Sequence, residues 1–122
     1  MQKILVVDDD DQVRELIQDI LCHYDYELTL AQNGREALKL CQKDEPDLLI
    51  TDIVMPEMEG IETIIQIRKK HPRLPMIAIS GGGQISSDVY LAMAKNLGAS
   101  RTLSKPFTKS ELLDAVSKAL NE

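Results

Sequence analysis

The chain has 122 residues, of which 43% are hydrophobic, and a formal net charge of −6. This length suits one compact domain with its own core, so residues 1–122 are predicted to form a single domain. The negative charge disfavours nucleic acid as a direct partner, because phosphate binding depends on clustered Lys and Arg. Each apolar run is far shorter than the roughly 20 residues of a membrane-spanning helix. We therefore expect a cytoplasmic protein that does not enter a membrane.

Cysteine and basic residues offer no separate site. Cys22 and Cys41 lie in helical patterns without a Cys-x-x-Cys spacing, so we expect both to be buried as small hydrophobic residues. The basic segment 68–73 falls at an expected helix end, where the helix dipole favours cations. We interpret it as a helix terminus.

The first half of the chain alternates strands with helices. Residues 3–7 are an apolar run that predicts a strand, and apolar residues spaced by three and four within 12–24 predict a helix. Asp10 or Asp11 is the expected helix cap. Residues 27–31 alternate like an outer strand, and Asn33-Gly34 precedes a helix with apolar residues at Ala37, Leu38 and Cys41.

The second half repeats this order. The expected elements are a strand over 47–52, a helix with Ile61, Ile64, Ile65 and Ile67 on its inner side, a strand over 75–80, a helix over 85–97 ending at Gly98, a strand over 100–104 and a last helix. Thr108 and Glu111 form the capping-box pattern of the last helix. Leu112, Leu113, Val116 and Leu120 make up its predicted buried side. Strict alternation of strands and helices predicts an α/β fold, a doubly wound parallel sheet of five strands with five helices on its two faces.

Polar residues follow the strands of this predicted sheet. Asp8 and Asp9 follow the first strand, Asp52 ends the third, Ser80 ends the fourth and Lys105 follows the fifth. The carboxyl ends of parallel strands meet at one edge, so these side chains are expected to gather there. Three carboxylates would repel one another without a cation. Oxygen ligands of this kind favour Mg²⁺, which also binds phosphate oxygens.

Asp52 is then the candidate nucleophile, because an aspartate carboxylate can attack phosphorus and form an aspartyl phosphate. Lys105 and Ser80 would stabilise charge on the transferred group. Taken alone, residues 8–11 also fit an acidic helix start. An EF-hand calcium loop is disfavoured, since its alternating acids and sixth-position glycine are missing.

Taken together, the chain resembles the receiver domain of bacterial two-component response regulators over essentially its whole length. The matching features are Asp8-Asp9 after 4–7, Asp52 with Met55-Pro56 and Gly60, Ser80, Gly98-Ala99, and Lys105-Pro106-Phe107. The resemblance implies the flavodoxin-like strand order 2-1-3-4-5 and phosphoryl transfer to Asp52 from the phosphohistidine of a sensor histidine kinase or phosphotransfer protein. It also implies a cis bond between Lys105 and Pro106.

The same resemblance assigns ligands and roles. Asp8, Asp9, Asp52 and the backbone carbonyl of Val54 would bind Mg²⁺ or Mn²⁺. Ser80 and Lys105 would contact the phosphoryl group. Output to a downstream effector or a fused output domain would pass through the surface formed by helix 85–97, strand 100–104 and the last helix. Candidate surface residues there are Tyr90, Met93, Arg101 and Lys109.

One departure from the family concerns switching. Thr102 occupies the place three before the lysine where receivers usually carry an aromatic residue. Gly81, Gly82 and Gly83 follow Ser80, so the hypothesis is that ordering of loop 81–84 and displacement of helix 85–97 replace the aromatic movement.

Two other functions compete with a self-phosphorylating and self-dephosphorylating receiver that has no separate substrate. An aspartate-nucleophile phosphatase wants a second Asp two residues after the nucleophile, where Val54 stands. A docking module that keeps the fold without being phosphorylated fits Thr102 but not the complete set of acids, hydroxyl and lysine. The sequence leaves open a phosphorylation-dependent dimer, and whether the chain is stand-alone or part of a larger regulator.

Overall fold

A computed structural model describes residues 1–53, 59–80, 92, 95–96 and 98–121. Its elements are β1 (Gln2–Val7), α1 (Asp11–Leu21), β2 (Tyr26–Ala31), α2 (Gly34–Lys43), β3 (Leu48–Asp52), α3 (Glu59–Lys70), β4 (Met76–Ser80), β5 (Arg101–Ser104) and α5 (Lys109–Leu120). The predicted loop over 81–84 and most of the predicted helix over 85–97 lie outside the described residues. In the rest of the chain, element order follows the sequence prediction.

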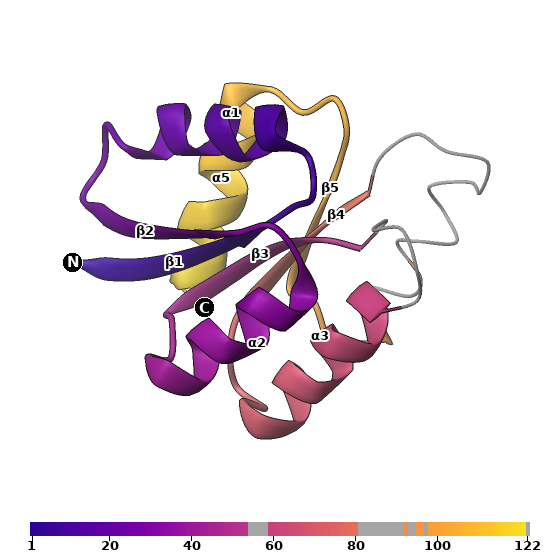
Figure 1. The fold of residues 1–122 in the computed structure, drawn as a ribbon. Helices are drawn as coiled ribbons and strands as arrows, with labels where there is room; N and C mark the ends of the chain where they lie inside the picture. Colours follow the sequence, from indigo (N-terminus) through magenta and orange to yellow (C-terminus); the bar gives the residue numbers. More distant parts are fainter. Residues whose placement is uncertain (54–58, 81–91, 93–94, 97, 122) are drawn as a thin grey trace.

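The five strands form one parallel sheet in the order β2-β1-β3-β4-β5. This confirms the predicted fold class and strand order. β1 lies between β2 and β3, and β4 lies between β3 and β5, so the ends of β1, β3 and β4 meet near the middle of one sheet edge (Figure 1). Connections between parallel strands cross a face of the sheet, and among the described residues α1 and α5 lie on one face while α2 and α3 lie on the other.

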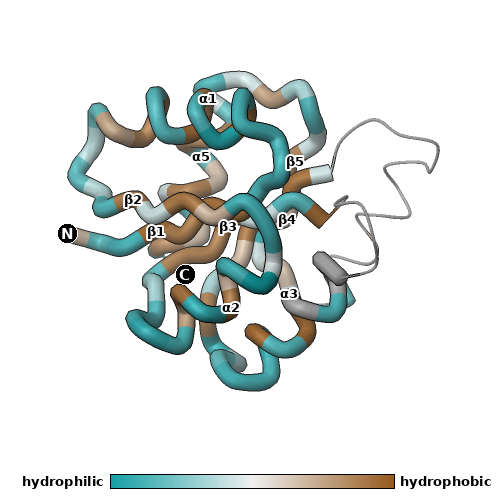
Figure 2. The backbone as a smooth tube through the Cα atoms, in the orientation of Figure 1, coloured by the Kyte–Doolittle hydropathy of each residue, from teal (hydrophilic) through white to brown (hydrophobic). Residues whose placement is uncertain are grey.

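The two faces carry separate apolar clusters because strand side chains alternate in direction. One cluster joins Ile4 and Val6 of β1 to α1 and α5. The other joins Leu5 and Val7 of β1 to α2 and α3. Figure 2 shows the same arrangement, with the inner strands largely hydrophobic and the helices marked by hydrophilic stretches. The sheet is therefore a buried middle layer, and its polar edge is where a site can form.

The helix starts follow the predicted capping chemistry. Asp10 is the N-cap of α1, where its side chain accepts a bond from the Gln12 N–H at 2.9 Å. The Thr108 hydroxyl accepts from the Glu111 N–H at 3.1 Å, while the Thr108 N–H donates to the Glu111 carboxylate at 3.0 Å. Both predicted caps are confirmed, since each side chain supplies a partner that the first turn of a helix lacks.

Gly98 has a φ of +83°, the left-handed backbone predicted for it after a helix. The Arg68 guanidinium reaches this turn from the end of α3 and donates to the Gly98 carbonyl at 3.2 Å and to the Pro72 carbonyl at 3.1 Å. The basic end of α3 therefore has a structural role, as the sequence indicated.

Two expected burials are wrong, those of Ile65 and Cys22. Ile65 is 37% exposed, because it lies at the margin of the apolar stripe of α3 and only one face of the helix packs on the sheet. Leu16, for which the sequence predicted only a place in a helix, is 46% exposed. Cys22 is also exposed: α1 ends at Leu21, and Cys22 is the C-cap residue at that end of the helix. Cys41 is buried as expected. The described residues include no helix that is long and apolar enough to cross a membrane.

Candidate functional site

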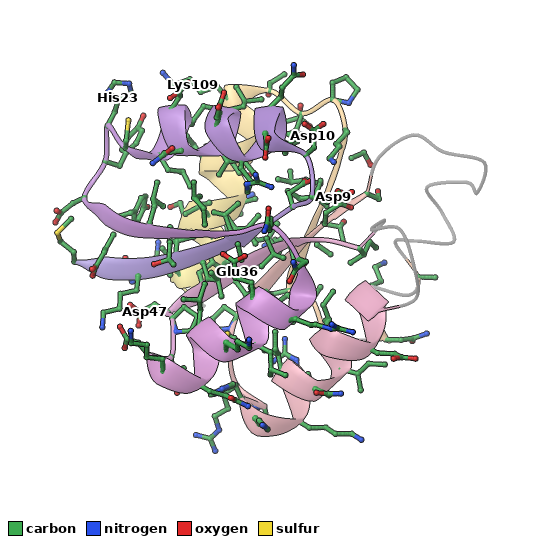
Figure 3. The ribbon with its side chains drawn as sticks, viewed as in Figure 1. Asp9, Asp10, His23, Glu36, Asp47 and Lys109 are labelled. Atoms are coloured by element: carbon green, nitrogen blue, oxygen red, sulfur yellow. The ribbon has the colours of Figure 1, made fainter. Side chains whose placement is uncertain are left out.

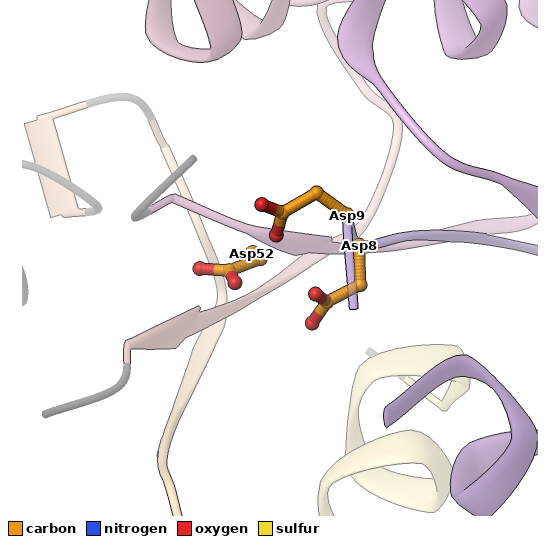
Figure 4. Close-up of side chains that lie close together, drawn as sticks. All are labelled: Asp8, Asp9 and Asp52. Atoms are coloured by element: carbon orange, nitrogen blue, oxygen red, sulfur yellow. The ribbon is translucent and has the colours of Figure 1, made fainter. Parts of the chain in front are cut away.

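Three carboxylates meet at the carboxyl edge of the sheet. Asp8 follows β1 directly, Asp52 ends β3, and parallel pairing of these two strands puts them side by side. Asp9 is the next residue of the β1–α1 turn. One ligand oxygen from each of the three lies within 4.8 Å of the others. Figure 4 shows the three side chains gathered at this edge. The predicted cluster is therefore present.

Asp8 is held at each of its polar groups. Its N–H donates to the Ala31 carbonyl at 3.2 Å, and its Oδ1 accepts the N–H of Asp10 at 2.9 Å. Its backbone carbonyl accepts from the Arg14 guanidinium. Its Oδ2 lies 3.2 Å from Lys105 Nζ, a distance that makes an ion pair. The side chain is fully buried, and the contacts with Asp10 and Lys105 hold its two oxygens in place.

Lys105 connects the two buried acids. Its Nζ donates to Asp52 Oδ2 at 2.9 Å. Its backbone N–H donates to the Ser80 carbonyl at 2.7 Å, and the bond to Pro106 is cis, as the family resemblance implied. Burial lowers the pKa of Lys105, but the hydrogen bond and charge of Asp52 and the charge of Asp8 outweigh it. The net shift is upward, so the ammonium form persists at neutral pH.

The charge balance of the cluster is unfavourable without a further cation. Burial is the main cause that raises the pKa of Asp8 from 3.8 to about 6, and the charge of Asp52 adds to it. The Asp10 N–H and Lys105 act in the opposite direction. One ammonium thus faces two buried carboxylates, with the exposed Asp9 beside them. Because all the donors are oxygens, a hard divalent cation such as Mg²⁺ fits the cluster.

Ser80 completes the set from β4, which pairs with β3. Its side chain is 1% exposed, and among the described residues its Oγ has no hydrogen-bond partner. An unused buried hydroxyl costs free energy unless a ligand engages it. Ser80 therefore offers a donor at the same edge as Asp52.

The structure describes only some of the remaining predicted residues. Val54, Gly81, Gly82, Tyr90 and Met93 lie outside the described residues, so their predicted roles stay predictions. Thr102 is half-buried in β5 and pairs with Ala78 of β4. Arg101 is half-buried beside it, and Lys109 is exposed at the start of α5. No aromatic residue can swing inward at Thr102, as the sequence already indicated.

Arg14 is a residue of the site that was not predicted from the sequence. Its spacing from Asp11 matches the i, i+3 ion pairs of helices, and the structure shows that pair. Its contact with the Asp8 carbonyl has no signal in the sequence, because it depends on the path of the turn. Figure 3 marks Asp9 and Asp10 on this turn, between β1 and the start of α1.

The comparison with protein families gives one clear match. The family model described as the response regulator receiver domain matches residues 4–117. The chain therefore belongs to the response regulator receiver domain family.

Individual relatives agree with this assignment. The response regulator MprA of Mycolicibacterium vanbaalenii is 40% identical over 111 residues, covering 91% of this chain and 47% of the relative. The MprA protein of Mycobacterium ulcerans is 38% identical with the same coverage. The chain thus spans about half the length of the curated relatives it matches.

Solved structures of receiver domains also match nearly the whole chain. The CheY-like receiver domain protein of Methanospirillum hungatei has a TM-score of 0.87 and 28% identity, covering 99% of this chain and 94% of its own. The receiver domain of NtrX from Brucella abortus has a TM-score of 0.87 and 31% identity, covering 97% and 98%. The flavodoxin-like fold is the one shared with these neighbours.

Proposed function

We propose that the protein is a phosphoacceptor of two-component signalling, which takes a phosphoryl group onto Asp52 in a Mg²⁺-dependent reaction. The observation that carries the proposal is the joint placement of a buried Asp52, two further acids and the Lys105 ammonium at one sheet edge. The family assignment supports the same conclusion.

Asp52 is the group that reacts. One carboxylate oxygen attacks the phosphorus of the donor, the bond from phosphorus to the donor imidazole breaks, and the imidazole leaves with the bonding electron pair and takes up a proton. Lys105 Nζ already lies 2.9 Å from Asp52 Oδ2, so it can stay with that oxygen or pair with the new phosphoryl oxygens. The Ser80 hydroxyl is available to donate to the same group.

Asp8, Asp9 and Asp52 would hold the cation, together with the carbonyl predicted for Val54. When bound, Mg²⁺ or Mn²⁺ neutralises charge on carboxylate and phosphoryl oxygens. The chain's own residues provide the rest: Asp8 offers oxygens fixed in direction, and Lys105 balances the charge of Asp52. Self-phosphorylation and self-dephosphorylation are the only reactions proposed.

The partners are proposed by chemical class. A histidine kinase or phosphotransfer protein would supply the phosphohistidine, and a downstream effector or an output domain would respond to phosphorylation. Direct contact with nucleic acid is not expected of a domain with a net charge of −6. A cytoplasmic location and switching through loop 81–84 remain predictions.

The test is the mass of the intact protein after incubation with acetyl phosphate and Mg²⁺. One added phosphoryl group is expected for the wild type, and none for Asp52→Asn or for wild type with excess EDTA. Asp47→Asn is a matched control, since this acid lies at the opposite end of β3 and accepts the Lys3 N–H at 2.7 Å. An unmodified wild type would support the docking module instead, and steady hydrolysis of added phosphomonoesters would support the phosphatase.

A further inference from the structure

We infer that Arg14 is a positioning residue for the metal-binding acids: its guanidinium fixes the turn between β1 and α1 that carries Asp8 and Asp9. This inference rests on the proposed function, because its main consequence is the affinity of the acid cluster for a divalent cation.

The Arg14 side chain closes the turn from both ends. Its Nη1 donates to the backbone carbonyl of Asp8, where the turn begins, and its Nη2 pairs with the Asp11 carboxylate, where α1 begins. Asp9 and Asp10 lie between these two acceptors. The Arg14 side chain is only 14% exposed, whereas that of Asp11 is 79% exposed. The guanidinium is therefore held against the turn, and Asp9 lies in a segment tied at both ends.

The contact with the Asp8 carbonyl matters because Asp8 is fully buried. A buried carbonyl needs a donor, and the other polar groups of Asp8 already face Ala31, Asp10 and Lys105. Arg14 supplies the donor for the carbonyl. Without it, the peptide group between Asp8 and Asp9 loses an anchor, and the direction of both carboxylates is less well defined before a cation binds.

Charge alone does not account for Arg14. A guanidinium near the cluster opposes binding of a cation, and the Asp11 carboxylate, its ion-pair partner, offsets that effect. The Arg14–Asp11 ion pair therefore adds little net charge near the acid cluster. Its effect on cation binding then comes from the way its hydrogen bonds hold the turn. The planar fork of arginine can reach two acceptors at once, whereas a lysine ammonium acts as a single point.

The experiment uses the whole chain and first compares wild type, Arg14→Gln, Asp11→Asn and the double variant. The double variant keeps the net charge of the turn and removes the clamp. Mg²⁺ affinity is measured by isothermal titration calorimetry on metal-free protein. We expect the double variant and Arg14→Gln to bind Mg²⁺ roughly tenfold more weakly, at the lower end of the effect of outer-sphere residues on metal sites. Asp11→Asn, which keeps the bond to the Asp8 carbonyl, should lose less.

Two further readouts separate positioning from loss of folding. Amide exchange at Asp9 and Asp10 should be faster in metal-free Arg14→Gln than in wild type. With acetyl phosphate, the Mg²⁺ concentration for half-maximal labelling should rise about tenfold, while the rate at saturating Mg²⁺ falls much less, because Asp52, Ser80 and Lys105 are unchanged. Urea unfolding shows that each variant is folded, and Arg73→Gln, an exposed arginine after α3, is the matched control.

Arg14→Lys keeps the charge and should show the same weakened Mg²⁺ binding. The inference would be overturned if the double variant bound Mg²⁺ as tightly as wild type and its amides exchanged at the wild-type rate. It would also be overturned if Arg14→Lys bound Mg²⁺ as tightly as wild type. If the wild type itself binds no Mg²⁺, the proposed function fails. Amide exchange of the turn in Arg14→Gln then still decides whether Arg14 positions it.

Discussion

Asp8 gives a prediction about stability that is independent of phosphorylation. Its pKa is raised from 3.8 to about 6, chiefly by burial, so the folded protein holds the proton more tightly than the unfolded chain does. The contribution of Asp8 to folding is then fully present below pH 3.8 and is lost as the pH rises through about 6. Asp8→Asn removes this pH dependence, because an amide does not titrate.

The size of the effect follows from the same values. At about 1.4 kcal/mol for each pH unit, the interval from 3.8 to about 6 corresponds to about 3 kcal/mol. The neighbouring Asp9 is exposed, so water at the mouth of the site screens part of this energy, and about 2 kcal/mol is the expected effect. Metal-free Asp8→Asn should thus gain about 2 kcal/mol relative to wild type between low and neutral pH.

Urea unfolding followed by far-ultraviolet circular dichroism measures this, with EDTA present, at several pH values from about 4.5 to 7.5. The quantity of interest is the free energy of unfolding of Asp8→Asn minus that of wild type, since the other titrating groups cancel in the difference. Asp25→Asn, an exposed acid after α1, is the control and should give a flat difference. If the difference in the free energy of unfolding between Asp8→Asn and wild type were also independent of pH, the reasoning that burial raises the pKa of Asp8 would be refuted. Added Mg²⁺ should stabilise the wild type at neutral pH more than it stabilises Asp8→Asn.

Other outcomes follow from single features of the structure. Mg²⁺ affinity should rise about tenfold for each pH unit up to about pH 6 and level off at higher pH, because Asp8 must lose its proton to act as a ligand. A Mg²⁺ affinity that calorimetry shows to be independent of pH would contradict this. A thiol reagent such as DTNB should label the exposed Cys22 in the native protein. Cys41 should react only on unfolding, since it is buried and burial raises the pKa of its thiol to about 11. Equal labelling rates of the two cysteines in the native protein would contradict this. Leu112→Ala should lower the free energy of unfolding in urea by about 2–5 kcal/mol, because Leu112 is 0% exposed. Leu16→Ala, at a 46% exposed site, should lower it by at most about 0.5 kcal/mol. Similar losses at both sites would show that the two packing assignments are wrong.

Much of the fold follows from local patterns in the sequence. Alternation of short apolar runs with helical spacing predicts the order of elements, and parallel strands carry Asp8, Asp52 and Ser80 to one sheet edge whatever the details of packing. Lys105 reaches that edge because it follows β5 directly. The acid cluster could thus be predicted from strand ends alone.

Burial at the margins of helices could not be predicted in this way. Leu16 and Ile65 have apolar spacing but remain partly exposed, because exposure depends on how far the neighbouring elements extend. Cys22, the C-cap residue of α1, is exposed. The pKa of Asp8 and the contact of Arg14 with its carbonyl depend on the three-dimensional path of the turn.

The most direct test of phosphorylation at Asp52 is chemical trapping of the modified residue. After incubation with acetyl phosphate and Mg²⁺, sodium borohydride reduces an aspartyl phosphate to homoserine, which peptide mass spectrometry locates in the sequence. We predict homoserine at position 52 and at no other aspartate, with none formed in EDTA. Homoserine at Asp8 or Asp9, or equal yields with and without Mg²⁺, would contradict the assignment of Asp52 as the phosphoacceptor.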